Sequence, residues 1–465
     1  MNKSRLPFLC FLTSILTLPS LALENPNEIP PREVTDRILV RYLQEPTYAN
    51  ALGFIKQGVT HGGFGVAAGK RKDVLAIGSS VNITDAQTLA DGLESDPQVL
   101  FAEPDFIMQT MQVPNDSRYN EQWHYFETTA GINLPSAWDI TTGSSSVIVG
   151  VIDTGVVDHP DLQPNVIDGY DFISHSWIAN DGSGRDADAT DPGDAITRTG
   201  ACGTANGQPV PSQPTSSSWH GTHVSGTIAA ASNNGNGVAG VAWNAKVMPL
   251  RALGRCGGYS SDIVDAMRWA AGLNVYGLTT NPNPVKVVNM SLGGTALGCP
   301  RHYQDAINEL VAAEVTVVVA AGNENRNAYL STPANCNNVI SVGAIDRGGD
   351  RSWYSNFGSN VDIAAPGGET RYYGNGVLST ANSGVTTEVQ DNYEYYQGTS
   401  MATPHVAGVA ALIYSIRPNI SPARVEDIIK SSARGFSNSS CTVALCGAGI
   451  LDAGAALLRT LSEPN

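Results

Sequence analysis

The order of apolar and amphipathic segments in most of this chain predicts an α/β fold, with a mainly parallel sheet and helices on both faces. From Trp138 onwards, short apolar strands alternate with segments of helical spacing. Several strand candidates are continuous runs of Val, Ile and Ala, as expected for strands covered on both faces. The predicted strands are 147–152, 246–253, 285–290, 315–320, 339–344 and 361–364, and the predicted helices are 220–231, 260–271, 303–313, 399–415 and 422–432.

A smaller α+β unit is expected ahead of this domain. After a polar, Pro-rich stretch at 24–32, residues 36–43 alternate as a strand. Residues 84–93 have helical spacing, and a closing strand is expected within 96–105. An independent domain with no role in the chemistry of its neighbour is the alternative interpretation.

The first residues have the pattern of a secretory signal peptide. Lys3 and Arg5 precede an apolar run at 8–18, and Ser20-Leu21-Ala22 offers small residues for cleavage after Ala22. The apolar run is short for a membrane span, and no other stretch is long enough. We therefore expect an exported, soluble protein without a membrane anchor; a retained N-terminal anchor is the alternative.

Length, charge and cysteines narrow the class of protein further. The chain has 465 residues, enough for two or three folded units, and a formal net charge of −16. That charge disfavours nucleic acid as a partner and favours solubility and cation binding. Apart from Cys10 in the signal peptide, six cysteines in an exported chain predict three disulfides, with fifteen possible pairings. They are Cys202, Cys256, Cys299, Cys336, Cys441 and Cys446.

Four polar residues stand where a serine-based acyl-transfer site needs them. Asp153 ends the strand at 147–152, His220 begins a predicted helix, and Ser400 follows a glycine turn ahead of small residues. A serine hydroxyl needs a base to take its proton and a third group to orient that base. Asn323 follows the strand at 315–320. Asp153 and Asn323 thus lie at carboxyl ends of strands, where ligand sites of parallel sheets are found.

Each of these residues also has another interpretation when taken alone. Asp153 is compatible with a turn at a strand end, Ser400 with a helix cap, and His220 with His223 as part of a metal pair. The metal pair is disfavoured, because the helix of a zinc protease carries HExxH, and a glycine and a threonine stand between these histidines.

Together, the four segments resemble the subtilisin family of serine proteases. The order Asp, His, Ser along the chain is the one found in subtilisin. The resemblance implies Ser400 as nucleophile, His220 as base, Asp153 as the group that orients the base, and Asn323 as an oxyanion donor.

This resemblance runs from about Asp116 to the C-terminus, and the preceding unit is similar to the inhibitory propeptide of the same family. The implied organisation is a signal peptide at 1–22, an inhibitory propeptide at 23–111 and a catalytic domain at 112–465. The end of the propeptide is expected between 106 and 115.

Two glycine-containing segments resemble the edges that pair with the substrate backbone in subtilisins. Glycine suits both places, because a peptide must approach the main chain closely to add a strand. Plain turns are the alternative. The implied substrate-binding residues are Ser291, Leu292, Gly293 and Gly294 on one edge, and Gly257, Gly258 and Tyr259 on the other.

The resemblance also narrows the disulfide pairing. Cys299 and Cys336 follow segments that flank the same substrate pocket in subtilisins, and Cys441 and Cys446 are close in sequence. The implied pairs are Cys202–Cys256, Cys299–Cys336 and Cys441–Cys446.

Structural Ca²⁺ is the expected cofactor, at two sites, and no organic cofactor is implied. The segment at 231–238 resembles a subtilisin calcium loop, with oxygen ligands that suit Ca²⁺ rather than zinc. Its expected ligands are Asp116, Asp161, Ala231, Asn234, Asn236 and Val238. A second, acidic site is expected from Asp181, Asp186, Asp188, Asp191 and Asp194, which repel one another unless a cation neutralises them. An Asn-Gly turn and a solvated acidic loop are the respective alternatives.

The sequence therefore predicts a secreted, calcium-stabilised, monomeric endopeptidase made as a self-processing zymogen. Its partners would be protein or peptide substrates and its own propeptide as intramolecular inhibitor. An inactive binding protein on the same scaffold is one alternative, but it would be expected to lack a residue of the site, and none is missing. An esterase is the other, although the two glycine-containing edges favour peptides.

Overall fold

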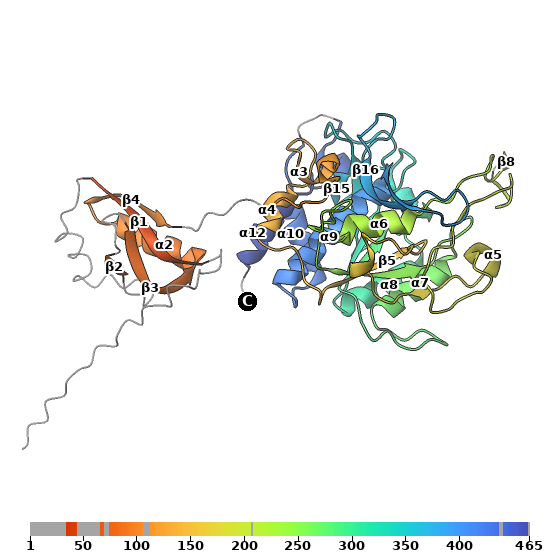
Figure 1. Cartoon of the computed structure of the whole chain (residues 1–465), viewed down its shortest axis with the longest axis horizontal. Helices are drawn as coiled ribbons and strands as arrows, with labels where there is room; N and C mark the ends of the chain where they lie inside the picture. Colours follow the sequence, from red (N-terminus) through yellow and green to blue (C-terminus); the bar gives the residue numbers. More distant parts are fainter. Residues whose placement is uncertain are drawn as a thin grey trace, which may run out of the picture. The chain divides into compact units, whose positions relative to one another are not determined.

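The computed structural model describes residues 34–43, 66–68, 74–105, 112–205, 208–436 and 440–463 (Figure 1). The expected signal peptide at 1–22 and the polar stretch at 24–32 lie outside these residues, as does part of the interval in which the propeptide is expected to end. The chain divides into two compact units, Met1–Thr110 and Met111–Asn465, and each is described by itself.

The first unit is a four-stranded antiparallel sheet with one helix packed on it. Ala86, Leu89 and Leu93 of the helix are buried together with Ile38 and Leu75 of the sheet. The strand expected at 36–43 and the helix expected at 84–93 are both present, whereas the second and third strands were not predicted. The sheet order is β2-β3-β1-β4, with β1 (Val34–Tyr42), β2 (Val66–Ala68), β3 (Val74–Asn82) and β4 (Val99–Pro104); the helix is α2 (Ile83–Glu94).

The second unit is built on a seven-stranded sheet in which every neighbouring pair is parallel. The six strands predicted from the apolar runs are all present. The seventh, β6, has two residues and is too short to leave a periodic pattern in the sequence. The order is β15-β14-β12-β10-β5-β9-β6, with β5 (Ile148–Asp153), β6 (Tyr170–Asp171), β9 (Lys246–Arg251), β10 (Val287–Met290), β12 (Thr316–Ala320), β14 (Ile340–Ile345) and β15 (Ile363–Pro366).

Helices cover both faces of this sheet, as predicted, and each face has its own core (Figure 1). Alternate residues of one strand serve the two cores: Val318 packs in the first, and Val317 and Val319 pack in the second. The first core contains α6 (His220–Ala229), α9 (Thr399–Ile416), α10 (Pro422–Ser431) and α12 (Ala453–Leu461), and the second contains α7 (Ser260–Ala270) and α8 (Arg301–Ala312).

The long helix α9 runs through the first core, and all of its residues from Met401 to Tyr414 are buried. Small side chains make this possible. A Cβ added at Gly408 would lie 2.6 Å from Cβ of Val241, so the helix could not pack at this distance with a larger residue there. Because α9 is held along its whole length, the residues of its first turn have a fixed position at the edge of the sheet.

Several elements outside the sheet were not predicted, mostly because they are too short to show a period. The longer exception is a hairpin of β16 (Val377–Asn382) and β17 (Asp391–Tyr396). Among the helices that the structure describes, none has both the length and the apolar character needed to cross a membrane. The remaining elements are α3 (Trp123–Phe126), α4 (Leu134–Trp138), α5 (Ser176–Ala179), α11 (Val443–Cys446), β7 (Thr204–Ala205), β8 (Gln208–Pro209), β11 (Gly294–Thr295), β13 (Ser331–Thr332) and the 3-10 turns η1 (Tyr119–Glu121), η2 (Gln163–Asn165) and η3 (Ala328–Leu330).

Candidate active site

Asp153 and His220 are brought together by the end of β5 and the start of α6. The Nδ1 atom of His220 lies 2.8 Å from Oδ1 and 3.0 Å from Oδ2 of Asp153. Asp153 is fully buried, and Oδ1 also accepts a hydrogen bond from the backbone N–H of Thr154 at 2.8 Å. A buried carboxylate on Nδ1 fixes the orientation of the imidazole and leaves Nε2 as the atom able to take a proton.

The charges around His220 favour its protonated form. Burial lowers the pKa of His220. The negative charge and the hydrogen bond of Asp153 raise it, and so do the charges of Asp194 and Asp191. The net effect raises the pKa of His220 above its ordinary value. The site can therefore stabilise the imidazolium that forms when the histidine accepts a proton.

Ser400 is the second residue of α9, and its backbone is tied to the segment that follows β10. Its hydroxyl donates to the carbonyl oxygen of Ser291 at 3.1 Å, and the Ser291 hydroxyl donates to the carbonyl oxygen of Ser400 at 2.8 Å. Asn289 in turn donates to the Ser291 hydroxyl at 3.0 Å. Among the described side chains, Ser400 and His220 share no hydrogen bond; in enzymes without substrate this contact is often long and tightens on binding.

The side-chain nitrogen of Asn323 and the backbone nitrogen of Ser400 lie beside the same glycine. A Cβ atom added at Gly398 would lie 3.5 Å from Nδ2 of Asn323 and 3.5 Å from the backbone nitrogen of Ser400. Gly398 has φ +150°, which L side chains rarely adopt, so the space between the two nitrogens stays open. A side-chain amide and a backbone N–H this close to one space are the kind of donors expected at an oxyanion site.

A cavity of about 710 Å³ joins His220 to both glycine-containing edges. A Cβ at Gly258 would lie 2.0 Å from the carbonyl oxygen of Ala252, so only glycine fits that edge. The structure thus brings all seven predicted substrate-binding residues to one cleft with His220. The lining includes Ser291, Leu292, Gly293, Gly294, Gly257, Gly258 and Tyr259, together with residues that were not predicted, among them Thr154, Asp194, Ser218, Leu253, Ile263 and Tyr303.

The comparisons with known proteins agree with this geometry. Residues 144–449 match the subtilase family. The chain belongs to the subtilase family. It is 48% identical over 379 residues to an extracellular protease of Xanthomonas campestris pv. campestris, which covers 81% of this chain and 62% of that relative. It is 43% identical over 397 residues to an extracellular basic protease of Dichelobacter nodosus, covering 84% of this chain and 63% of that relative.

A solved structure of a protease from Pseudoalteromonas arctica PAMC 21717 superposes on this subtilase with a TM-score of 0.71 and 52% sequence identity, covering 75% of this chain and 100% of that one. The α/β fold with helices on both faces is therefore the subtilase fold. This subtilase spans less than two thirds of the length of the two relatives from Xanthomonas and Dichelobacter.

Three disulfides join the same cysteines that the resemblance paired. Cys202 is bonded to Cys256 with a Cα–Cα distance of 5.6 Å, and Cys256 lines the cleft. The other two bonds are Cys299–Cys336, with a Cα–Cα distance of 4.8 Å, and Cys441–Cys446, with one of 5.5 Å.

The residues of the first expected calcium site lie together and fit a cation. Asp161 is fully buried; its carboxylate accepts from Nδ2 of Asn234 at 2.8 Å and from the backbone N–H of Val238 at 2.9 Å. Burial raises its pKa to about 6, and the nearby charge of Asp116 adds to the rise. Oδ1 of Asp116 is buried without a hydrogen-bond partner. Two buried carboxyl groups, one with an unpaired oxygen, are a donor set that Ca²⁺ would satisfy.

The other expected ligands, Ala231 and Asn236, make hydrogen bonds to Asp161 and Asn234. The backbone N–H of Ala231 donates to the carbonyl oxygen of Asp161 at 2.7 Å, and that of Asn236 donates to Oδ1 of Asn234 at 2.8 Å. Within the described ranges, no three His, Cys, Asp or Glu side chains are grouped as a metal site. Any cation here would therefore need oxygens of the backbone and of Asn234 beside the two carboxylates.

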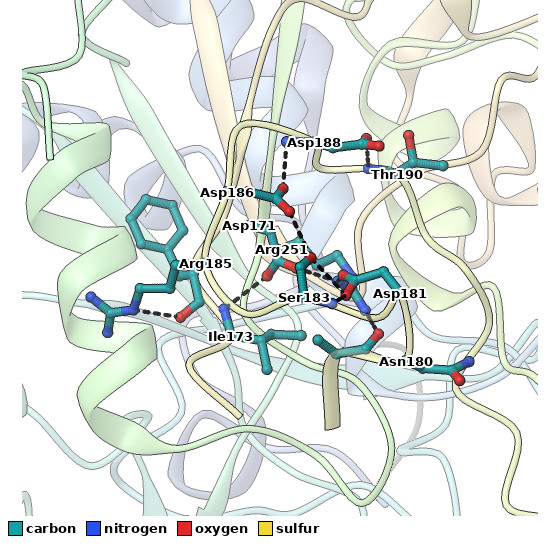
Figure 2. A network of polar contacts seen from close by, with 12 residues as sticks. Asp171, Ile173, Asn180, Asp181, Ser183, Arg185, Asp186, Asp188, Thr190 and Arg251 are labelled. Atoms are coloured by element: carbon teal, nitrogen blue, oxygen red, sulfur yellow. Dashed lines mark hydrogen bonds and ion pairs between the residues drawn. The ribbon is translucent and has the colours of Figure 1, made fainter. Parts of the chain in front are cut away.

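The acidic segment expected to form a second calcium site is arranged differently. Only Asp181 and Asp186 lie together, bridged by the Ser183 hydroxyl at 3.0 and 2.8 Å, whereas Asp188, Asp191 and Asp194 bond other partners. Arg251, almost fully buried, lies between Asp171 and Asp181 and bonds Asp181 at 2.7 Å (Figure 2). The cationic group between these two carboxylates is thus an arginine at the end of β9, which the sequence analysis did not single out.

The other four aspartates each close a turn or hold a neighbouring segment. Asp186 accepts from the backbone N–H of Asp188 at 2.8 Å, and Asp188 from that of Thr190 at 3.0 Å (Figure 2). Asp191 accepts from the Thr154 hydroxyl at 2.7 Å, and Asp194 accepts two hydrogen bonds from Ser218. None of these aspartates has a buried carboxylate oxygen without a partner, so the fit seen at Asp116 is not repeated here.

Proposed function

We propose that this subtilase is a secreted serine endopeptidase, made as a self-processing zymogen, that cleaves peptide bonds through an acyl-enzyme. The observation that carries the proposal is the single cleft in which His220, oriented by Asp153 at 2.8 Å, faces two backbone edges suited to an extended peptide. The relatives named as extracellular proteases support both export and proteolysis.

In this mechanism the Ser400 hydroxyl turns from the carbonyl of Ser291 and attacks the scissile carbonyl while His220 takes its proton. Asp153 stabilises the imidazolium. The oxygen of the tetrahedral intermediate lies between Nδ2 of Asn323 and the N–H of Ser400. His220 then gives its proton to the departing amine, which leaves the acyl group on Ser400, and a water deprotonated by His220 releases it.

The first unit would serve as the inhibitory propeptide, and the cut would fall between Phe106 and Asp116. Asp116 is buried beside the loop after α6, and the backbone N–H of Arg118 donates to the carbonyl of Gly237 at 2.8 Å. A mature chain that began later would lose these contacts. N-terminal sequencing of secreted protein tests this. A mature chain that begins after Asp116 would contradict both the proposed cleavage interval and the role of Asp116 in calcium binding.

Structural Ca²⁺ would be held by Asp161, Asp116 and the oxygens of the 231–238 loop. The ion would neutralise the two buried carboxylates and tie the start of the mature chain to the end of α6. A second calcium ion at the acidic segment beside Arg251 stays a prediction. The mature enzyme would act on protein or peptide substrates as a monomer.

A fluorophosphonate probe tests the proposed nucleophile. Wild type should be labelled on Ser400, as peptide mass spectrometry would show, and should cleave casein. Ser400→Ala should be folded, unlabelled and recovered as uncleaved precursor from a host without other proteases. Normal maturation of Ser400→Ala in that host would exclude self-processing, and labelling elsewhere would exclude Ser400. Hydrolysis of nitrophenyl esters without cleavage of any peptide would favour the alternative that the protein is an esterase.

A further inference from the structure

A carboxylate stands in the cleft on the side of the catalytic histidine. Oδ1 of Asp194 accepts from the backbone N–H of Ser218 at 2.6 Å, and Oδ2 accepts from the Ser218 hydroxyl at 2.8 Å. Asp194, Ser218 and His220 all line the cavity of about 710 Å³. Because Ser218 is two residues before His220, the hydrogen bonds hold the carboxylate of Asp194 beside the imidazole.

The charge of Asp194 is not balanced by the protein. It is the one carboxylate among the residues that line the cleft, and that lining contains no Lys or Arg. Among the residues that the structure describes, no ion pair includes Asp194. Its charge acts inside the site, since it contributes to the raised pKa of His220. Each carboxylate oxygen can accept more than one hydrogen bond, so Asp194 can bind a further donor.

The rest of the lining differs in character. Leu253, Ile263, Leu292 and Tyr303 offer apolar surface, and the two edges consist of backbone and glycine. A positively charged substrate side chain therefore has one carboxylate to bind in this cleft, that of Asp194. An extended peptide points successive side chains to opposite sides. If the residue that carries the scissile carbonyl faces the wall at Ser291–Gly294, the residue before it faces His220 and Asp194.

We propose that Asp194 makes this cleft select a Lys or Arg side chain at the residue immediately before the one whose carbonyl is attacked. The inference rests on the proposed endopeptidase function and adds its specificity. The ammonium or guanidinium group would bond the carboxylate that Ser218 already holds in position. For a partly exposed pair of this kind, we expect a preference of about two- to fivefold over a neutral side chain of equal length.

The test uses mature enzyme and fluorogenic peptides that differ only at that residue, which is Lys, norleucine or Glu. For wild type, kcat/KM should fall in that order, and the Lys:norleucine ratio should shrink as salt screens the attraction. In Asp194→Asn the ratio should fall to about one. Asp168→Asn, which removes an exposed aspartate outside the cleft lining, is the control for net charge and should keep the wild-type ratio.

Comparing ratios within each variant separates specificity from any change in the amount of active enzyme. The salt dependence of wild type needs no variant, so the proposal stays testable if Asp194→Asn fails to mature. Equal cleavage of the Lys and norleucine peptides by wild type would overturn the role of Asp194 while leaving the endopeptidase intact. A Lys preference that survives in Asp194→Asn would also overturn it. Failure of wild type to cleave any peptide would overturn the proposed function itself.

Discussion

The side-chain oxygen of Asn323 accepts two hydrogen bonds from Thr399, one from its backbone N–H and one from its hydroxyl, each 2.9 Å long. With the oxygen held in this way, Nδ2 of Asn323 points to the open space beside Gly398 that the N–H of Ser400 also faces. Thr399, which precedes the proposed nucleophile, thus fixes which end of the Asn323 amide faces away from it. The Thr399 hydroxyl also accepts from the N–H of Gly322 at 3.1 Å, which joins the two loops.

Removing the amide should affect chemistry more than binding. We expect Asn323→Ala to lower kcat by about 10²–10³-fold with little change in KM, the loss known for the corresponding donor of subtilisin. Thr399→Val, which keeps the shape but not the hydroxyl, should lower kcat by roughly tenfold. Thr399→Ser, which keeps the hydroxyl, should have a kcat close to that of wild type. Steady-state kinetics on one peptide checks all three; an unchanged kcat in Asn323→Ala would remove this residue from the oxyanion site.

Buried histidines should make the fold sensitive to acid. His124 and His405 are fully buried, with Nδ1 of the first 2.8 Å from Nε2 of the second. Burial lowers the pKa of His405 to about 4 and that of His223 to about 3. The unfolded chain, with ordinary histidine pKa values, binds more protons below about pH 6.5, so these groups reduce the free energy of unfolding as the pH falls towards 4.

We therefore expect the melting temperature of the inactive Ser400→Ala protein to fall between pH 6.5 and 4. Burial also raises the pKa of Asp191 to about 7, that of Asp161 to about 6 and that of Asp171, which acts in the opposite direction over this range, so the histidine contribution is read from the difference between variants. His405→Gln should reduce the pH slope whatever its effect on stability at pH 7. His175→Gln, at an exposed position, is the matched control and should keep the full slope. Equal slopes in the two variants would rule out His405 as a source of the sensitivity.

The disulfide Cys299–Cys336 should support both stability and activity. It closes a separation of 37 residues, for which the chain-entropy estimate is about 3–4 kcal/mol of unfolding free energy. Pro300, next to Cys299, and Thr332, four residues before Cys336, line the cleft. Replacing both cysteines by alanine should lower the melting temperature and raise KM.

The bond Cys441–Cys446 provides the matched control, because it spans only 5 residues and none of the residues next to its cysteines lines the cleft. Its removal should cost less stability and leave KM unchanged. Peptide mapping without reduction checks the pairs directly. A KM that responds equally to the two removals would show that the effect of Cys299–Cys336 is not exerted through the cleft.

Calcium should stabilise the mature enzyme through the site at Asp161. A ligand that binds only the folded state adds about 2.7 kcal/mol at a hundredfold excess over its Kd. Chelation should therefore lower the melting temperature and speed autolysis. Asp161→Asn should abolish most of the difference between calcium and chelator, because the carboxylate is an expected ligand. Asp188→Asn should reduce it only if the acidic segment binds a second ion. A wild type indifferent to chelator would exclude both sites.

The sequence alone placed Asp153 and Asn323 at the carboxyl ends of predicted strands, where ligand sites of parallel sheets are found, and the resemblance supplied the proposed roles of His220 and Ser400. Asp153 ends β5, and Asn323 and Ser291 follow β12 and β10; the structure added that these three strands are neighbours in the sheet. The glycines of the two proposed substrate edges also stood out in the sequence, and the structure places them on one cavity; a backbone that must be approached closely excludes side chains.

Only the tertiary structure decided where the charges go. The aspartates between 181 and 194 predict a second calcium site, but the sequence did not show that Arg251, from a strand 57 or more residues later, lies between Asp171 and Asp181, or that Ser218 bonds Asp194 at the cleft. The contact of Thr399 with Asn323 and that of His124 with His405 likewise join distant segments. Periodicity reports which face of an element is buried; it carries no information on which polar group from elsewhere in the chain will meet that face, because this depends on how the elements pack.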